Sequence, residues 1–252
     1  MMHGFNKIIF STVLIVVSST IGSPLRGELT TDQIIAKARD YLGGDAQLRA
    51  VETIQFQGTF TTHEGVGRGD ILIYLKKPFK QRLDVIRAHD GIIETTAIND
   101  IDGWGRRANE KDADDWTIRI LSMGELKRMR ANTFDNLNFY NGIEQLGGNI
   151  INKGIVNKDG KNAYLLHFKY DKTIHYKRYF EVSTGKLLAT VNDKGIEIKD
   201  IDEFIVDGIR FPREQIRIED GKMKDTLTFT KIMINAPLDD RIFELPSLRF
   251  GK

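Results

Sequence analysis

Apolar and polar residues alternate along much of the chain, and a period of two is typical of β-strands. From Ile54 to Phe60, an apolar residue or a glycine stands at every second position, with Gln or Thr between them. This alternation predicts a strand with one buried face. Comparable segments follow at 71–77, 80–88 and 92–98, and strand patterns resume from Asn149 onward. Turn signals recur at roughly ten-residue spacing, which predicts an antiparallel sheet of up-and-down hairpins with about ten strands.

Two segments have the period of a helix. Residues 30–42 place apolar side chains three and four positions apart, begin with the capping-box pair Thr30 and Gln33, and end at Gly43-Gly44. Ser122 opens a second helix, with Glu125 as its capping partner. A polar loop is expected over 108–115, before this second helix. The expected buried positions of the two helices are Ile34, Ile35, Ala38, Leu42, Leu126, Met129 and Phe134.

Several predicted strands are apolar on both faces. Ile71 to Leu75 and Tyr164 to Leu166 are continuous apolar runs, which a flat sheet with one solvated face does not need. They fit a curved sheet with an apolar interior whose outside or mouth is covered by the helices. The fold class predicted is mostly β with two or three helices, in a partly closed antiparallel barrel. A barrel filled solidly by side chains fits the same pattern, so a cavity does not follow from it alone.

The N-terminus has the layout of a secretory signal peptide. Lys7 supplies a positive charge, Ile8 to Val17 is almost wholly apolar, and small or polar residues follow up to Gly22. The apolar core is about half as long as a bilayer requires, so a transmembrane helix fits less well. We expect residues 1–22 to be a signal peptide cleaved near Gly22 and residues 23–252 to form one exported domain. An uncleaved N-terminal anchor is the alternative.

Composition removes several classes of protein. The chain has no cysteine, which excludes a disulfide scaffold and an acylated N-terminal cysteine. Its formal net charge is only +2, which argues against nucleic acid as a partner. The basic pairs Lys76-Lys77 and Arg106-Arg107 each have acidic residues nearby and are expected to be solvated strand edges.

No segment carries a recognisable catalytic or metal-binding motif. The histidines lack the spacing of a metal-binding helix, although His167 and His175 are expected on adjacent strands and could face each other. No GxSxG elbow is present. The glycines of 65–69 lie between predicted strands, as in a hairpin rather than a phosphate loop. The acidic run at 112–115 lacks the glycine and terminal glutamate of a calcium loop. We therefore expect no enzyme activity, no cofactor and no metal.

Four short segments, taken in order after the signal peptide, resemble one known family. They are Tyr74-Leu75-Lys76-Lys77-Pro78 followed by Arg82, the Asp102-Gly103-Trp104 turn, Phe204-Ile205-Val206-Asp207-Gly208-Ile209-Arg210-Phe211-Pro212, and Pro237-Leu238-Asp239-Asp240 with residues 243–246. In these features the chain resembles the LolA/LolB-like periplasmic lipoprotein carriers, the outer-membrane lipoprotein-sorting proteins. The resemblance spans most of the mature chain.

The resemblance implies an unclosed antiparallel β-barrel with a helical lid over an apolar cavity for acyl chains. It implies a soluble, monomeric periplasmic carrier that takes lipoprotein or other lipid cargo from an inner-membrane ABC-type exporter toward an outer-membrane acceptor. Such a carrier needs no covalent chemistry. The residues expected to line the cavity are Phe56, Phe60, Ile73, Leu75, Leu83 and Trp104 on strands, with Ile35 and Leu126 on the helices that gate it.

The chain departs from the family pattern at the strand-end motif. Carriers of the family have a functional Arg immediately before the Pro, where this sequence has Lys77. Lysine keeps the charge but lacks the planar, bidentate geometry of a guanidinium, and Arg82 lies close enough to substitute. Gln81 stands where carriers have an apolar residue. These departures leave room for a cargo other than a triacylated lipoprotein.

Two other functions remain open from the sequence. Periplasmic regulators that sense lipoproteins share the fold, and they usually carry a further domain, whereas this chain ends soon after residue 246. An exported hydrolase requires a convergent polar site, which the sequence does not indicate.

Overall fold

The computed structural model describes residues 29–65 and 67–246, so the predicted signal peptide lies outside the described residues. The described chain forms thirteen strands, three α-helices and two short 3-10 helices. The strands are β1 (Thr53–Thr62), β2 (Arg68–Lys76), β3 (Lys80–Arg87), β4 (Ile92–Asn99), β5 (Asp102–Asn109), β6 (Asp112–Ile120), β7 (Asn149–Lys158), β8 (Lys161–Lys169), β9 (His175–Glu181), β10 (Leu187–Asn192), β11 (Glu197–Val206), β12 (Ile209–Glu219) and β13 (Lys222–Ile234).

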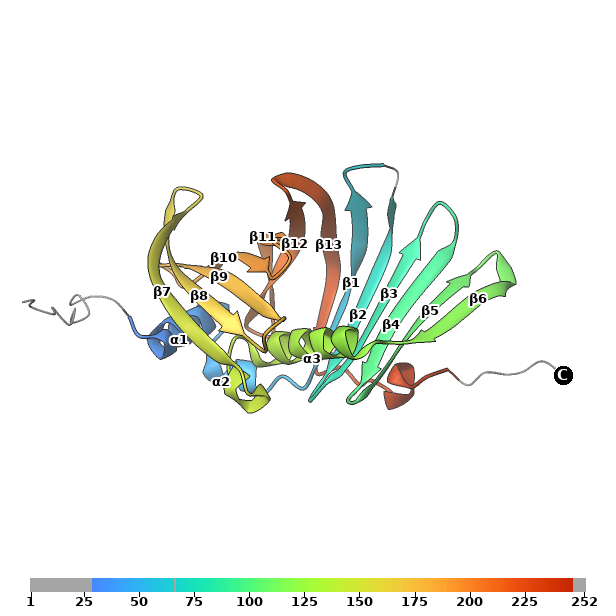
Figure 1. The fold of residues 1–252 in the computed structure, drawn as a ribbon, viewed down its shortest axis with the longest axis horizontal. Coiled ribbons are helices and arrows are strands. Elements are labelled where there is room, and N and C mark those ends of the chain that lie inside the picture. Colours follow the sequence, from blue (N-terminus) through green and yellow to red (C-terminus); the bar gives the residue numbers. More distant parts are fainter. Residues whose placement is uncertain (1–28, 66, 247–252) are drawn as a thin grey trace, which may run out of the picture.

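These strands form one antiparallel sheet in the order β6-β5-β4-β3-β2-β1-β13-β12-β11-β10-β9-β8-β7. Every neighbouring pair is consecutive in sequence except β1 and β13. Within the described chain, the edge strands β6 and β7 are not paired with each other, so the curved sheet remains open (Figure 1). The predicted unclosed antiparallel β fold is therefore confirmed.

Helix α3 (Met123–Asn138) links the two edges of the sheet and runs across its concave side (Figure 1). It begins as predicted, because the backbone N–H of Ser122 donates to Glu125 Oε2 at 2.9 Å and the Ser122 hydroxyl accepts from the Glu125 N–H. Leu126 and Phe134 lie on the buried face of this helix, as predicted. A 3-10 turn, η1 (Ile143–Leu146), then leads the chain to β7.

Helix α1 (Thr31–Leu42) also begins with its predicted capping box and ends at Gly43. A short helix that the sequence did not indicate, α2 (Asp45–Arg49), follows it. The Arg39 side chain ties the two helices to α3. Its guanidinium binds Asp45, and its Nη1 donates to the carbonyl of Asn138 at 2.7 Å. The helices thus form one connected layer on the concave side.

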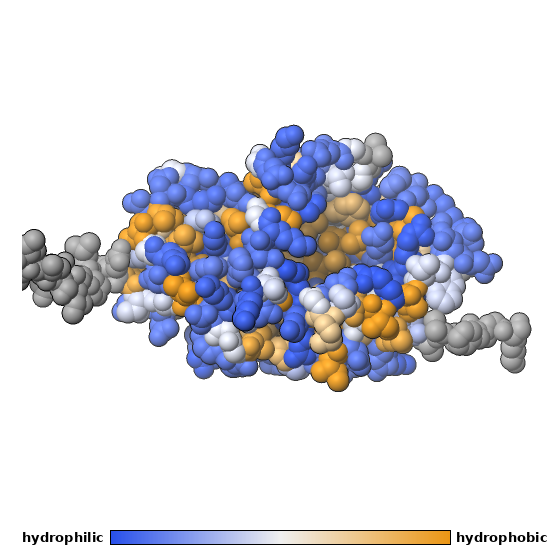
Figure 2. Space-filling model, in the orientation of Figure 1, coloured by the Kyte–Doolittle hydropathy of each residue, from blue (hydrophilic) through white to orange (hydrophobic). Residues whose placement is uncertain are grey.

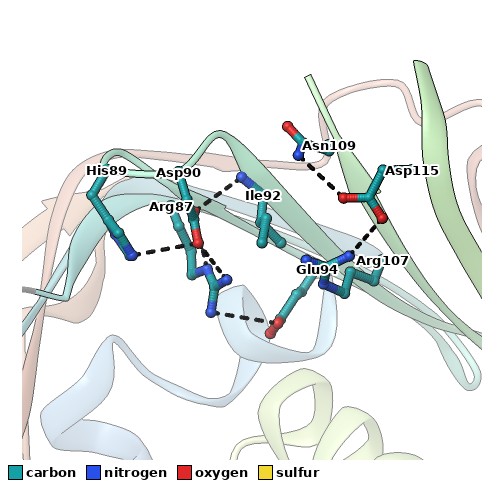
Figure 3. A network of polar contacts seen from close by, with 8 residues as sticks. All are labelled: Arg87, His89, Asp90, Ile92, Glu94, Arg107, Asn109 and Asp115. Carbon is teal, nitrogen blue, oxygen red and sulfur yellow. Dashed lines mark hydrogen bonds and ion pairs between the residues drawn. The ribbon is translucent and has the colours of Figure 1, made fainter. Parts of the chain in front are cut away.

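The estimate of about ten strands was too low, partly because a charged hairpin lacks an apolar pattern. The predicted loop at 108–115 is wrong: β5 continues to Asn109 and β6 begins at Asp112. The carboxylate of Asp115 accepts hydrogen bonds from Arg107 and Asn109 at 3.0 and 3.2 Å, as Figure 3 shows. Polar pairs between neighbouring strands, and not hydrophobic contacts, therefore stabilise this edge of the sheet.

Two large clusters of apolar side chains lie on the concave side. One cluster joins α1, α3 and strands β8 and β9, and includes the fully buried Phe168 and Phe180. The other joins α2, the end of α3 and strands β1, β2, β12 and β13. In the described ranges, none of the helices has the length and apolar composition needed to cross a bilayer.

Candidate functional site

A cavity of about 390 Å³ is lined by residues on the concave side of the sheet and by residues of α3. Asn132 and Asn136 of α3 line it and remain exposed to solvent, so the mouth of the cavity lies beside this helix. In Figure 2, apolar surface is visible at the floor of a recess bordered by hydrophilic residues. The apolar wall comes from β1, β2, β3 and β13 and consists of Ile54, Phe56, Ile71, Ile73, Leu75, Leu83, Leu227 and Phe229.

The register of the sheet explains why these residues share one face. Phe56 lies directly opposite Ile73, and Ile73 lies directly opposite Leu83. Paired residues of antiparallel strands point to the same side of the sheet. Because side chains alternate along a strand, Leu72 points to the convex side. The apolar run of β2 thus serves two faces.

The opposite wall of the cavity is polar and centres on an ion pair between α3 and β9. Arg178 Nη1 donates to Asp135 Oδ1 at 2.9 Å, and Arg178 Nη2 contacts Asp135 Oδ2. The Tyr170 hydroxyl donates to the same carboxylate at 2.7 Å. The Arg178 side chain is only 5% exposed, and its guanidinium lies 4.4 Å from the centre of the Phe168 ring. The charge of Arg178 is therefore matched inside the protein.

A second carboxylate, that of Asp200 on β11, faces the cavity without such a match. It accepts one hydrogen bond, from Gln215 Nε2 at 2.9 Å, and has no ion-pair partner among the described residues. Burial raises the pKa of Asp200 to about 6. Tyr140 also lines the cavity, and burial raises the pKa of its hydroxyl, which therefore stays protonated.

We expect Asp200→Asn to stabilise the protein near neutral pH and to have little effect below pH 4. The folded state keeps a proton on Asp200 that the unfolded chain releases at its ordinary pKa of about 3.9, so this contribution to stability is lost as the pH rises through 6. Because Asp200 keeps some accessible surface, we expect a gain of about 1–2 kcal/mol at pH 7.5. Urea unfolding of both proteins across pH 4–8 measures it. Parallel stability curves for the two proteins contradict the prediction.

Solved structures with this architecture are known, although no family model and no curated protein matches the chain. A LolA superfamily protein from Nitrosomonas europaea superposes with a TM-score of 0.55 at 11% identity, covering 86% of this chain and 99% of that one. The chain has the LolA-superfamily fold. A DUF1329 family protein from Desulfovibrio piger also superposes with a TM-score of 0.55, at 12% identity over 84% of this chain and 96% of the other.

The LolA-like fold brings together four of the eight residues predicted to line the cavity. Phe56, Ile73, Leu75 and Leu83 all lie in its apolar wall. Phe60 is paired with Leu227 of that wall and so shares its face, but lies beyond the cavity lining. Their contact with a ligand stays a prediction.

Two residues predicted to gate the cavity pack elsewhere in the LolA-like barrel. Ile35 belongs to the core between α1 and strands β8 and β9, and Leu126 packs with Ile98 and Leu121 near the start of α3. Neither lines the cavity. The part of α3 that does so is polar, with Asn132 and Asp135 among its lining residues, so the helix that borders the mouth is not an apolar lid.

Trp104 lies on the other side of the sheet. Trp104 is paired with Ala97, and Ala97 is paired with Arg82, so the three side chains share one face of the sheet. Arg82 lies between the cavity residues Gln81 and Leu83 on β3 and therefore points to the opposite, convex face. The Trp104 indole N–H donates to the carbonyl of Phe243 at 2.9 Å. The Asp102-Gly103-Trp104 turn therefore anchors the C-terminal segment of the chain and does not line the cavity.

The basic residues of the strand-end motif are also engaged outside the cavity. Lys77 Nζ lies 3.2 Å from a carboxylate oxygen of Glu52. Arg82 contacts Asp84, and its Nη1 donates to the Ile242 carbonyl at 3.0 Å. Gln81, in contrast, is buried in the cavity wall, where it accepts a hydrogen bond from Thr133 of α3. The polar residue at this position thus fixes α3 to β3.

Ion pairs at the far rim of β3 to β6 remain outside the cavity (Figure 3). Asp90 binds Arg87 at 2.5 Å and the backbone N–H of Ile92 at 3.2 Å.

On β8 and β9, the rings of His167 and His175 meet edge to face with centroids 5.1 Å apart, as the strand pattern suggested. No group of three or more potential metal ligands occurs in the part of the chain that the structure describes.

The sequence analysis missed the polar wall of the cavity. Asp200 stands two positions after Ile198, and both lie on the cavity face of β11. An acidic residue at an apolar position of the period-two pattern could have indicated a polar group in the cavity. No sequence pattern indicates the ion pair of Asp135 with Arg178, because it joins a helix to a strand 43 residues away.

Proposed function

We propose that this protein is an exported carrier that binds acyl chains of lipoproteins or other lipids in its cavity and transfers them toward the outer membrane. The observation that carries the proposal is the apolar wall facing an accessible cavity in a LolA-like fold. Export depends on the signal peptide predicted at residues 1–22, and the mass of the secreted chain tests cleavage near Gly22. Exchange with an ABC-type exporter and an outer-membrane acceptor belongs to the same proposal.

The size of the cavity fits a single acyl chain. A methylene group occupies about as much space as a water molecule, roughly 30 Å³, so a cavity of about 390 Å³ holds about 13 of them. Burying them contributes roughly 10 kcal/mol at about 0.8 kcal/mol each. Association costs at least about 4 kcal/mol, which leaves about 6 kcal/mol or less. Such affinity is reversible, as transfer requires.

We expect Ile73→Asp to weaken binding of a fluorescent fatty-acid probe at least tenfold, because a carboxylate in the apolar wall has no partner there. The matched control is Leu72→Asp, which places the same charge on the adjacent residue of β2 but on the convex side. Probe titration and circular dichroism of both variants measure binding and folding. Equal affinities for two folded variants contradict the assignment of the cavity.

Transfer itself is measured with two vesicle populations. The delipidated protein is expected to move a labelled lipopeptide with one acyl chain from donor to acceptor vesicles faster than spontaneous exchange, and Ile73→Asp is expected to abolish this acceleration. Binding of the probe without accelerated transfer favours the alternative, a periplasmic lipid or lipoprotein sensor with the same fold.

A further inference from the structure

The cavity has one carboxylate whose charge the protein leaves uncompensated. Four charged residues line it: Asp135, Arg178, Asp200 and Arg210. Asp135 and Arg178 neutralise each other, and Arg210 is ion-paired with Glu203 at 3.2 Å. Of these four residues, only Asp200 has no ion-pair partner in the part of the chain that the structure describes. A buried charge without a counter-ion is costly, so a group that supplies one is bound preferentially.

The groups around Asp200 leave room for a hydrogen-bond donor from a ligand. Gln215 supplies one hydrogen bond to Oδ1, and a carboxylate accepts more than one. Tyr140 also lines the cavity and is close enough to Asp200 for that charge to act on it, and its hydroxyl has no hydrogen-bond partner in the described part of the chain. Thr190 of β10 adds a second hydroxyl to this wall. A cationic head group therefore meets one unpaired anion and two hydroxyl acceptors.

This polar site adjoins the apolar wall directly. Gln215 on β12 is paired with Leu227 on β13, and β13 is paired with β1. Neighbouring strands lie about 4.8 Å apart, so the boundary between polar and apolar lining is one strand wide. An amphiphile with its chain against Ile73 and Phe56 therefore places its head at Asp200.

We propose that Asp200, with Gln215 and Tyr140, binds the polar head of the cavity ligand and that this head carries an ammonium group. The inference rests on the proposed function, since it assumes that the apolar wall holds an acyl or alkyl chain. It adds a selectivity: the site prefers a cationic head to a neutral one, and a neutral head to a carboxylate.

Three probes with identical chains test the proposal on the full-length protein: dodecylamine, dodecanol and dodecanoate. Each displaces a fluorescent fatty-acid probe from the delipidated protein at pH 7.5. A charge-assisted hydrogen bond is stronger than a neutral one, so dodecylamine is expected to bind about tenfold more tightly than dodecanol. Dodecanoate is expected to bind more weakly than dodecanol.

A charge-removing pair of variants assigns the selectivity to Asp200. Asp200→Asn is expected to remove the advantage of dodecylamine while dodecanol binds as before. The control is Glu214→Gln. Glu214 is next to Gln215 on β12, and the alternation of side chains places it on the opposite face of the sheet. This variant also loses a carboxylate, and we expect it to bind the three probes in the same order of affinity as the wild type. Circular dichroism shows that each variant is folded.

The pH dependence of the wild-type protein supplies a test without substitution. Dodecylamine stays protonated between pH 5 and pH 8, as a lysine side chain does. Burial raises the pKa of Asp200 to about 6, so its carboxyl group is mostly protonated at pH 5. We therefore expect dodecylamine to lose most of its affinity advantage over dodecanol at pH 5. Burial by itself raises the pKa of Glu203, but Lys186, Tyr41 and Arg210 together lower it below its ordinary value, so Glu203 stays ionised over this range. The charged and titratable groups that face Asp200 and its neighbour Tyr140 are Lys186, Glu203, Arg178 and Asp135.

The outcomes separate the head-group site from the proposed function. Equal binding of all three probes, or tightest binding of dodecanoate, overturns the ammonium site and leaves an acyl-binding cavity. A dodecylamine preference that survives in folded Asp200→Asn also overturns it. Failure of the fluorescent fatty-acid probe and of all three alkyl probes to bind overturns the proposed function itself.

Discussion

Replacing Arg178 with methionine is expected to lower the free energy of unfolding by about 3–5 kcal/mol, since it leaves a buried carboxylate without its partner. The Arg178 and Asp135 side chains are only 5% and 13% exposed. Methionine fills much of the same volume but supplies no donor to Asp135, which then keeps only the hydroxyl of Tyr170. Urea unfolding of the wild type and the variant at pH 7.5 measures the loss.

Two further proteins show whether the loss comes from the stranded charge. The double variant Arg178→Met with Asp135→Asn removes both charges, and we expect it to recover most of the lost stability. Lys199→Met breaks the exposed pair with Asp159 and is expected to cost less than about 1 kcal/mol. A double variant as unstable as Arg178→Met places the effect in packing against Phe168 instead.

Replacing Phe243 with alanine is expected to cost about 3–5 kcal/mol and to leave ligand binding intact. Phe243 is fully buried in the 3-10 turn η2 (Asp240–Phe243), and its carbonyl accepts the indole N–H of Trp104. The cost combines lost apolar burial with the cavity left behind. Because Trp104 and Arg82 hold this segment against the convex side, the cavity on the other side keeps its lining. Thermal unfolding and probe titration measure the two effects.

Leu245→Ala is the matched control, because Leu245 belongs to the same segment but is 49% exposed. We expect it to change stability by less than about 0.5 kcal/mol. A small loss for Phe243→Ala, equal to that of Leu245→Ala, means that the C-terminal segment detaches without affecting the sheet. Weaker probe binding by folded Phe243→Ala means that the two sides of the sheet are coupled.

Local signals in the sequence were sufficient for most of the fold. The capping boxes at Thr30 and Ser122 lie where the structure has them, because they depend on residues three positions apart. The turn at Asp207-Gly208 joins β11 to β12, and both residues have the positive φ that Asp and Gly tolerate. The open sheet followed from the resemblance and from apolar runs such as Ile71 to Leu75.

The errors arose where partners are distant in sequence or polar. The face to which Trp104 points depends on how β5 pairs with β4 and how β4 pairs with β3. A turn motif does not encode these pairings. The hairpin of β5 and β6 lacks an apolar pattern, so its acidic residues resembled a loop. The polar wall of the cavity required knowing that Asp135 of α3 meets Arg178 of β9.

The pairing of β1 with β13 has a consequence for how the protein is made. It joins segments near the two ends of the described chain, whereas each other strand pair in that chain joins consecutive strands. Because local hairpins close short loops, we expect them to form before this long-range pairing, whose loop-closure entropy is larger. Phe56 and Phe229 stand on the two sides of that seam and both face the cavity. The cavity is therefore complete only when β13 pairs with β1, and a chain truncated before β13 is expected to lack one of the cavity walls.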